Sequence, residues 1–158
     1  MQDTPKPQLN SLLPPTSQSL PVSLTRAREA VMAPIRKMLQ KAGITEQQWR
    51  VLRVLSESGK METGTLANRA ALMSPSLSRI VHSMENAGLV SREADPNDRR
   101  RQHIAITGAG QAIINDHMTE ASDIAAYYRD ILGEKDHDTL VTLLQKLTLR
   151  LNEEDHDA

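Results

Sequence analysis

Apolar residues recur every three or four positions along most of this chain, which is the spacing of helices with one buried face. The first such stretch lies between Ser23 and Gly43, and its apolar positions are Leu24, Ala27, Val31, Ile35, Met38, Leu39 and Ala42. We expect Ser23 to cap this helix and Gly43 to end it. Because proline lacks the amide hydrogen that a helix interior uses, Pro34 should kink the helix or divide it in two.

Three shorter helices are predicted to follow. The TEQQ segment at residues 45–48 fits a capping box and opens the first of them. A short helix is expected around residues 63–71. The third, at residues 74–87, has Pro75 in its first turn, and Gly88 is the expected left-handed residue that ends it.

An alternating pattern replaces the helical one at residues 89–94 and 102–106, and it predicts two β-strands. The DPND segment between them is a strong turn signal, so the two strands should form a hairpin with a charged tip. Thr107 is expected to cap a long helix that Gly133 ends. The last helix has leucines at a 4-3-4 spacing, typical of a seam against another helix: Leu140, Leu144, Leu147 and Leu151.

Three helices followed by a hairpin within about 60 residues is the pattern of a winged helix-turn-helix domain, whose second motif helix lies in the DNA major groove. We therefore expect a mostly α-helical fold with a winged helix-turn-helix lobe at residues 45–107. Helices at residues 22–44 and 108–152 flank this lobe. Residues 1–21 hold five of the eight prolines and show no period, so we interpret them as a disordered tail.

Charge is distributed unevenly along the chain. Residues 1–107 hold 15 Lys and Arg against 9 Asp and Glu, whereas residues 108–158 hold 4 against 11. A basic first part suggests a polyanionic partner, although two solvated faces of different charge would have the same composition. The absence of cysteine excludes disulfides, thiolate metal sites and a cysteine nucleophile. We see no membrane span or secretory signal and expect a soluble, cytoplasmic protein.

The helix at residues 74–87 has one apolar and one polar side. On a helical wheel Leu77, Ile80, Val81 and Met84 share the predicted buried face. The opposite face has no acidic residue at its centre, and serine, arginine and asparagine can bond base edges and phosphates. The candidate DNA-binding residues are Ser74, Ser76, Ser78, Arg79 and His82. An ordinary solvated helix face would show the same pattern, so this face alone leaves both interpretations open.

The hairpin tip favours the DNA-binding interpretation. Arg99, Arg100 and Arg101 are consecutive, repel one another and contribute little to folding. A phosphate backbone or a narrow minor groove would accommodate them. Asp98 is placed to orient one guanidinium group. An arginine run is commonly a solvated loop, but its position just after a helix-turn-helix indicates a DNA-binding wing.

The same residues carry a resemblance to MarR-family regulators. Asp98-Arg99-Arg100, followed by Thr107 nine residues after the aspartate, resembles the family's wing signature D-x-R-x6-L-T, with Ile106 in place of its leucine. The segments ITEQQWRVLR from Ile44 and SPSLSRIVHSMENAGLV from Ser74 are similar to the family's helix-turn-helix. The TEQQWR segment, AREA at residues 27–30 and the proline in the first helix look closest to the homoprotocatechuate-degradation repressor branch.

This resemblance implies a homodimer in which helices from both chain ends intertwine and two winged lobes bind a pseudopalindromic operator. It implies that Arg100 enters the minor groove with Asp98 supporting it. Many family members are repressors that small aromatic or phenolic acids release from DNA. The candidate residues for binding such an acid are Arg28, Trp49 and Arg50. In the alternative interpretation, Trp49 belongs to the core and the two arginines form ion pairs on the surface.

The sequence argues against two other function classes. The five histidines show no i, i+4 pair, and the chain lacks a glycine-rich phosphate loop and the common hydrolase motifs, so we expect no enzyme, no metal and no cofactor. The serious alternative is a winged-helix protein-interaction module that dimerises without binding DNA. The arginines at 99–101 argue against it, because a wing that contacts only protein has no need of them.

Overall fold

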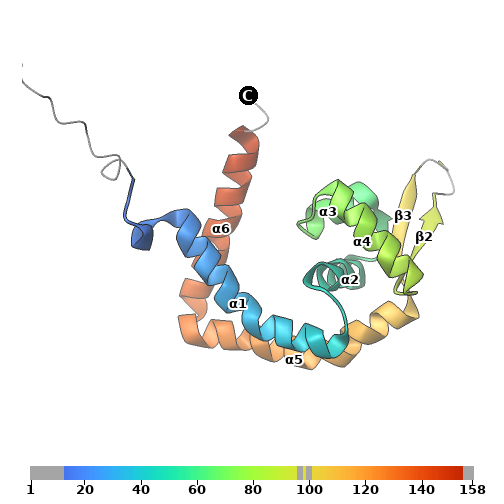
Figure 1. The fold of residues 1–158 in the computed structure, drawn as a ribbon, viewed down its shortest axis with the longest axis horizontal. Helices are drawn as coiled ribbons and strands as arrows, with labels where there is room; N and C mark the ends of the chain where they lie inside the picture. Colours follow the sequence, from blue (N-terminus) through green and yellow to red (C-terminus); the bar gives the residue numbers. More distant parts are fainter. Residues whose placement is uncertain (1–12, 96–97, 99–100, 155–158) are drawn as a thin grey trace, which may run out of the picture. The chain divides into compact units, whose positions relative to one another are not determined.

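The computed structural model describes residues 13–95, 98 and 101–154 (Figure 1). Its elements, in chain order, are a 3₁₀ turn (Thr16–Gln18), α1 (Leu20–Ala42), α2 (Glu46–Ser58), β1 (Met61–Glu62), α3 (Thr63–Arg69), α4 (Ser74–Asn86), β2 (Val90–Ala94), β3 (Gln102–Ile106), α5 (Gly108–Leu132) and α6 (Glu134–Glu154). The chain divides into two compact units, residues 1–37 and 38–158, and the boundary falls within α1. The order of elements is the one that the sequence predicts, with the 3₁₀ turn and β1 added. The 3₁₀ turn and the start of α1 lie within residues 1–21, so the prediction of a disordered tail is wrong for residues 16–18 and 20–21.

In the first unit, α1 begins earlier than predicted. The helix starts at Leu20, and the Ser23 amide already donates a hydrogen bond to the Ser19 carbonyl at 2.9 Å, so Ser23 is not its N-cap. Pro21 is compatible with this start, because the first helical turn needs no amide hydrogen from it. The helix continues through Pro34 as one element, so it is not divided in two there, and the alternative that Pro34 kinks it stays a prediction.

The second unit is organised around α2. The predicted capping box is present: the Thr45 hydroxyl accepts from the Gln48 amide at 3.2 Å, and the Gln48 side-chain carbonyl accepts from the Thr45 amide at 2.9 Å. This cap starts a helix whose apolar side is buried. The largest fully buried side chains come from six elements and form one core: Met38, Leu52, Leu55, Leu66, Leu77, Met84, Ile104 and Ile114, with Val51 and Val81.

The sheet has three strands in the order β1-β3-β2, all antiparallel. The β2–β3 hairpin has the predicted position, and Val90 pairs with Ile106 at its base. Strand β1 was not predicted, because two residues are too short to show an alternating pattern. Its residue Met61 pairs with Ile104, whose side chain is fully buried, so β1 covers the edge of β3 that β2 leaves free.

One joint connects the lobe to α5, and a second connects α5 to α6. At the first, the Thr107 hydroxyl accepts from the Gly110 amide at 3.1 Å, as predicted for the N-cap of α5. At the second, Gly133 has a positive φ of 78° and separates α5 from α6. Among the described residues, no helix is long and apolar enough to cross a membrane.

Candidate nucleic-acid interface

Helix α4 presents a polar face because its other face is anchored in the core. Leu77, Val81 and Met84 are fully buried, and Ile80 is half-buried beside them. Since helical residues three and four apart lie on one side, burial of these positions turns the intervening side chains outward. The helical-wheel prediction of the buried face is confirmed.

The predicted reading residues lie on the outward face of α4. Ser74, Ser78, Arg79 and His82 are exposed, and Ser76 is half-buried. Ser78 donates its hydroxyl to the Ser74 carbonyl at 3.2 Å, a local bond that leaves its oxygen able to accept another donor. The polar atoms are thus displayed together along one side of a rigid helix, which is the arrangement that groove recognition requires.

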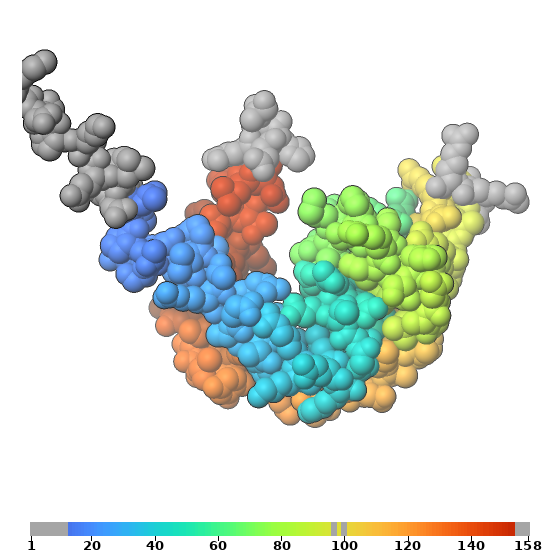
Figure 2. Space-filling model, viewed as in Figure 1, coloured from blue at the N-terminus to red at the C-terminus, as the bar shows by residue number. Residues whose placement is uncertain are grey.

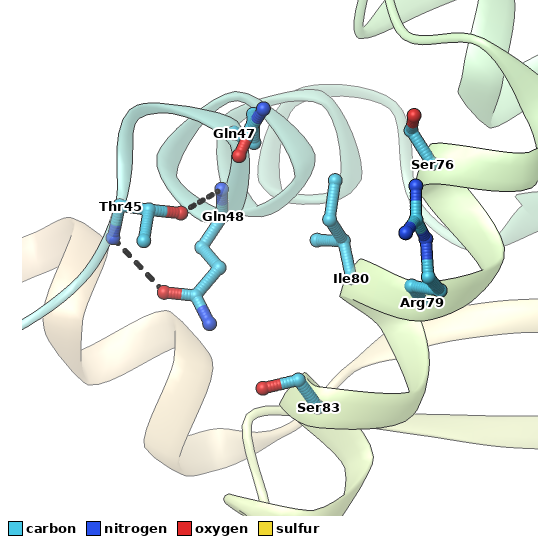
Figure 3. A pocket seen from close by; sticks show the side chains of 7 residues that line it. All are labelled: Thr45, Gln47, Gln48, Ser76, Arg79, Ile80 and Ser83. Carbon is cyan, nitrogen blue, oxygen red and sulfur yellow. Dashed lines mark hydrogen bonds between the residues drawn. The ribbon is translucent and has the colours of Figure 1, made fainter.

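A hollow of about 360 Å³ lies between the start of α2 and this face of α4. Figure 2 shows the surfaces of α2 (teal) and α4 (yellow-green) next to each other on the lobe, and Figure 3 shows the side chains that line the hollow. They are Thr45, Gln47, Gln48, Ser76, Arg79, Ile80 and Ser83. Two of the predicted DNA-binding residues, Ser76 and Arg79, therefore share a site with residues of another helix.

The base of the wing tip is held by backbone hydrogen bonds. The Asp95 amide donates to the Arg101 carbonyl at 3.0 Å, and the Arg101 amide donates to the Asp98 carbonyl at 2.9 Å. The Asp98 amide also donates to the Asp95 carboxylate at 3.3 Å. Arg99 and Arg100 lie outside the described residues, so the minor-groove contact that the family resemblance implies for Arg100 stays a prediction.

Ion pairs tie the wing to the rest of the lobe. Arg101 donates to Glu62 of β1 at 3.2 Å, and Arg92 donates to Glu85 of α4 at 2.7 Å. Lys60 donates to Glu93 at 2.7 Å, and this hydrogen bond raises the pKa of Lys60 above its ordinary value. Sequence reasoning missed these partners, because they depend on β1 and on the packing of β2 against α4. Of these three ion pairs, Arg92–Glu85 joins the hairpin directly to α4.

The three candidate ligand-binding residues have partners of their own. Trp49 is only 8% exposed and belongs to the core of the second unit, where Arg50 donates to the Ala71 carbonyl at 3.1 Å. Ala71 has a positive φ of 51°, and Arg50 supports the turn that contains it. In the first unit, Arg28 forms an ion pair with Glu29 at 3.0 Å. These placements agree with a structural role, and their proposed contact with an acid remains a prediction.

The C-terminal helix carries an apolar face that this single chain does not cover. Of the predicted seam, Leu140, Leu144 and Leu151 are 46%, 38% and 54% exposed, and Leu147 is half-buried. Other large apolar side chains of α5 and α6 are exposed as well: Ile131, Leu132, Val141, Leu143 and Leu149. In the described part of the chain, no group of three or more His, Asp and Glu side chains is arranged to hold a metal ion.

Comparison with known proteins agrees with this geometry. The MarR family matches residues 44–101, which span the lobe from α2 to the wing tip. The transcriptional regulator FarR of Neisseria gonorrhoeae is 36% identical over 129 residues, covering 82% of this chain and 88% of that protein. The homoprotocatechuate degradative operon repressor of Escherichia coli is 42% identical over 113 residues, covering 72% and 74% of the two chains.

A solved structure extends the agreement to most of the chain. NadR in complex with 4-hydroxyphenylacetate is 36% identical, covers 85% of this chain and 97% of that one, and superposes with a TM-score of 0.73. Both the sequence relatives and the fold therefore lead to the same assignment. This chain belongs to the MarR family of winged helix-turn-helix transcriptional regulators.

Proposed function

We propose that this regulator acts in the cytoplasm as a homodimeric repressor that binds a pseudopalindromic operator and is released by a small aromatic or phenolic acid. The observation that carries the proposal is the outward face of α4. Its serines, Arg79 and His82 stand on a helix whose other side is fully buried. A wing held at a defined position next to that helix supplies the second contact.

The leucine-rich face of α6 supports the homodimer. Monomeric soluble proteins rarely leave several large apolar side chains exposed on one helix, because their burial is favourable by about 25 cal/mol per Å². A second copy of the chain would cover the face and set the distance between two reading helices. In this arrangement the two half-sites lie about one helical turn, roughly 34 Å, apart on the DNA.

The proposal of an acid effector rests on relatives. One similar protein is named for repressing homoprotocatechuate degradation, and another was solved with 4-hydroxyphenylacetate. Both compounds are aromatic acids. An acid that binds the DNA-free arrangement of lobes more tightly would lower operator affinity by its difference in binding free energy, typically about 1–3 kcal/mol.

The test is a fluorescence-anisotropy titration of the dimer with duplexes from the region upstream of its own gene and with random duplexes. It is run at two salt concentrations, with and without 4-hydroxyphenylacetate. We expect tight binding to one palindromic duplex that weakens as salt rises, because binding releases counterions from phosphates. We also expect the acid to weaken that binding.

The possible outcomes test the operator and the effector separately. Tight binding that the acid does not change would keep the operator and remove this effector. If no duplex binds even at low salt, the protein-interaction alternative replaces the regulator mechanism.

A further inference from the structure

The hollow between α2 and α4 contains polar side chains that the predicted DNA interface leaves out. Thr45 and Gln48 line it, but their hydrogen bonds to each other's backbone already cap α2 (Figure 3). Gln47 from α2 and Ser83 from α4 line it too. The cap is therefore complete without a ligand, and any site here must be built from the other side chains.

Four of the lining side chains have hydrogen-bonding groups that no described protein group uses. Within the part of the chain that the structure describes, the side chains of Gln47, Ser76, Arg79 and Ser83 form no hydrogen bond or ion pair with protein. The guanidinium group brings five donors, the amide two and each hydroxyl one. None of the seven lining residues is acidic. This chemistry suits an anion with several acceptor oxygens.

The position of the hollow indicates which anion it takes. With α4 in the major groove, the sides of this helix face the two sugar-phosphate backbones that border the groove. Ser76, Arg79 and Ser83 lie on the side of α4 that faces α2. Gln47 adds a polar side chain from α2 to those of α4. A backbone phosphate thus meets donors from two elements at once.

We propose that a backbone phosphate of duplex DNA occupies this hollow, with Arg79 as its charged partner and Gln47, Ser76 and Ser83 as hydrogen-bond donors. This inference rests on the proposed function, since it requires α4 to lie in the groove. It makes Gln47 a positioning residue that helps to set the register of the lobe on DNA. It also assigns Arg79 to the backbone and not to a base edge.

The experiment adds a charge at Gln47, an exposed position. In Gln47→Lys, the new cation should tighten binding at low salt by about two- to fivefold, the range of an exposed ion pair. It should also steepen the slope of log K against log salt by about 0.9 for each bound protomer. Gln47→Glu should weaken binding. The probe is a 30-base-pair duplex selected from a random pool by the wild-type dimer.

The matched controls are Gln145→Lys and Gln145→Glu, because Gln145 is an exposed glutamine of α6. These control variants change the net charge by the same amounts as the Gln47 variants. They should leave the slope of log K against log salt almost unchanged. Methylphosphonate groups then replace the duplex phosphates one at a time. The advantage of Gln47→Lys should disappear for one phosphate position in each half-site and persist at the others.

Two results would overturn the inference while leaving the proposed function intact. One is an equal gain from Gln47→Lys and Gln145→Lys, and the other is a gain that no single methylphosphonate removes. Arg79→Ala is a second test. If Arg79 contacts the backbone, this substitution should lower affinity by a similar factor for the selected duplex and for duplexes with substituted base pairs. A loss limited to one base pair would make Arg79 a base reader. If the wild-type dimer binds no duplex, both proposals fail.

Discussion

At the scale of single residues, the proposed DNA interface depends on side chains that folding leaves with unused hydrogen-bond donors. Arg79 is available because Leu77 and Val81 take the buried positions of its helix. This much follows from helical spacing, and sequence reasoning predicted it. The partner of Arg101 did not follow, because Glu62 lies on a two-residue strand far away in the chain. The spacing of apolar residues predicts which face of an element a side chain lies on, but it does not predict which residue that side chain contacts.

The wing arginine offers the first prediction at this scale. Arg100→Ala should weaken operator binding by about 1–3 kcal/mol, as expected for loss of an arginine contact to DNA. The salt slope should flatten by about 0.9 for each protomer if the guanidinium displaces a counterion. Titrations at four salt concentrations measure both quantities. Lys146→Ala on α6 is the control, and an unchanged slope in Arg100→Ala would rule out a wing contact with phosphate.

Gly110 offers a second prediction, on stability. A Cβ atom at this position would clash with the Leu89 carbonyl oxygen and lie 2.9 Å from the Ile106 side chain. The carbonyl is backbone and cannot move aside easily, so Gly110→Ala should cost about 1–3 kcal/mol in the free energy of unfolding. Urea denaturation measures this.

Gly108 is the matched control for Gly110, since it lies in the same helical turn. An added Cβ at Gly108 meets nothing within 4 Å. Gly108→Ala should be neutral or more stable by about 0.4–1 kcal/mol, because alanine restricts the unfolded chain. Equal effects of the two substitutions would contradict the close approach of α5 to Leu89.

At the scale of elements, local signals predicted helices α2, α4 and α5 together with the hairpin. The capping box, the early proline of α4 and the glycines after the helices act within a few residues, so the sequence shows them directly. The sequence pattern places the start of α1 too late, because it groups Pro21 with the tail although proline suits a first helical turn. Strand β1 exists only through its pairing with β3.

Thr107 joins two elements and gives the prediction at this scale. Its hydroxyl donates to the Gly88 carbonyl at 2.7 Å and accepts from the Gly110 amide at 3.1 Å. Thr107→Val keeps the shape and the extended backbone but removes both bonds. Its free energy of unfolding should fall by about 1–2 kcal/mol. The urea midpoint should shift with little change in the m-value.

Thr107→Ser keeps the hydroxyl and is the matched control for the valine variant. Its stability should lie close to that of the wild type. A serine variant as unstable as the valine variant would show that the methyl group, and not the two hydrogen bonds, holds this joint together.

At the scale of the whole molecule, the exposed leucine seam predicts assembly. Leu144→Asp places a charge on the seam and should convert the proposed dimer to monomers in analytical ultracentrifugation. Operator affinity should fall by about a hundredfold or more, because the second lobe is then no longer tethered to the first. Gln145→Asp introduces the same charge at the neighbouring exposed position, and it should remain dimeric. A monomer that binds the operator tightly would contradict the proposed architecture.

The sequence by itself determined where most elements begin and end, which faces are apolar and which family the chain resembles. Those properties depend on capping, turn residues and spacing, which act over a few residues. Only the tertiary structure decided that Gln47 and Arg79 line one hollow, that Arg101 pairs with Glu62 and that α5 passes close to Leu89. These contacts join residues that are far apart in the chain, and they depend on how the whole core packs. Patterns that extend over a few residues therefore do not predict them.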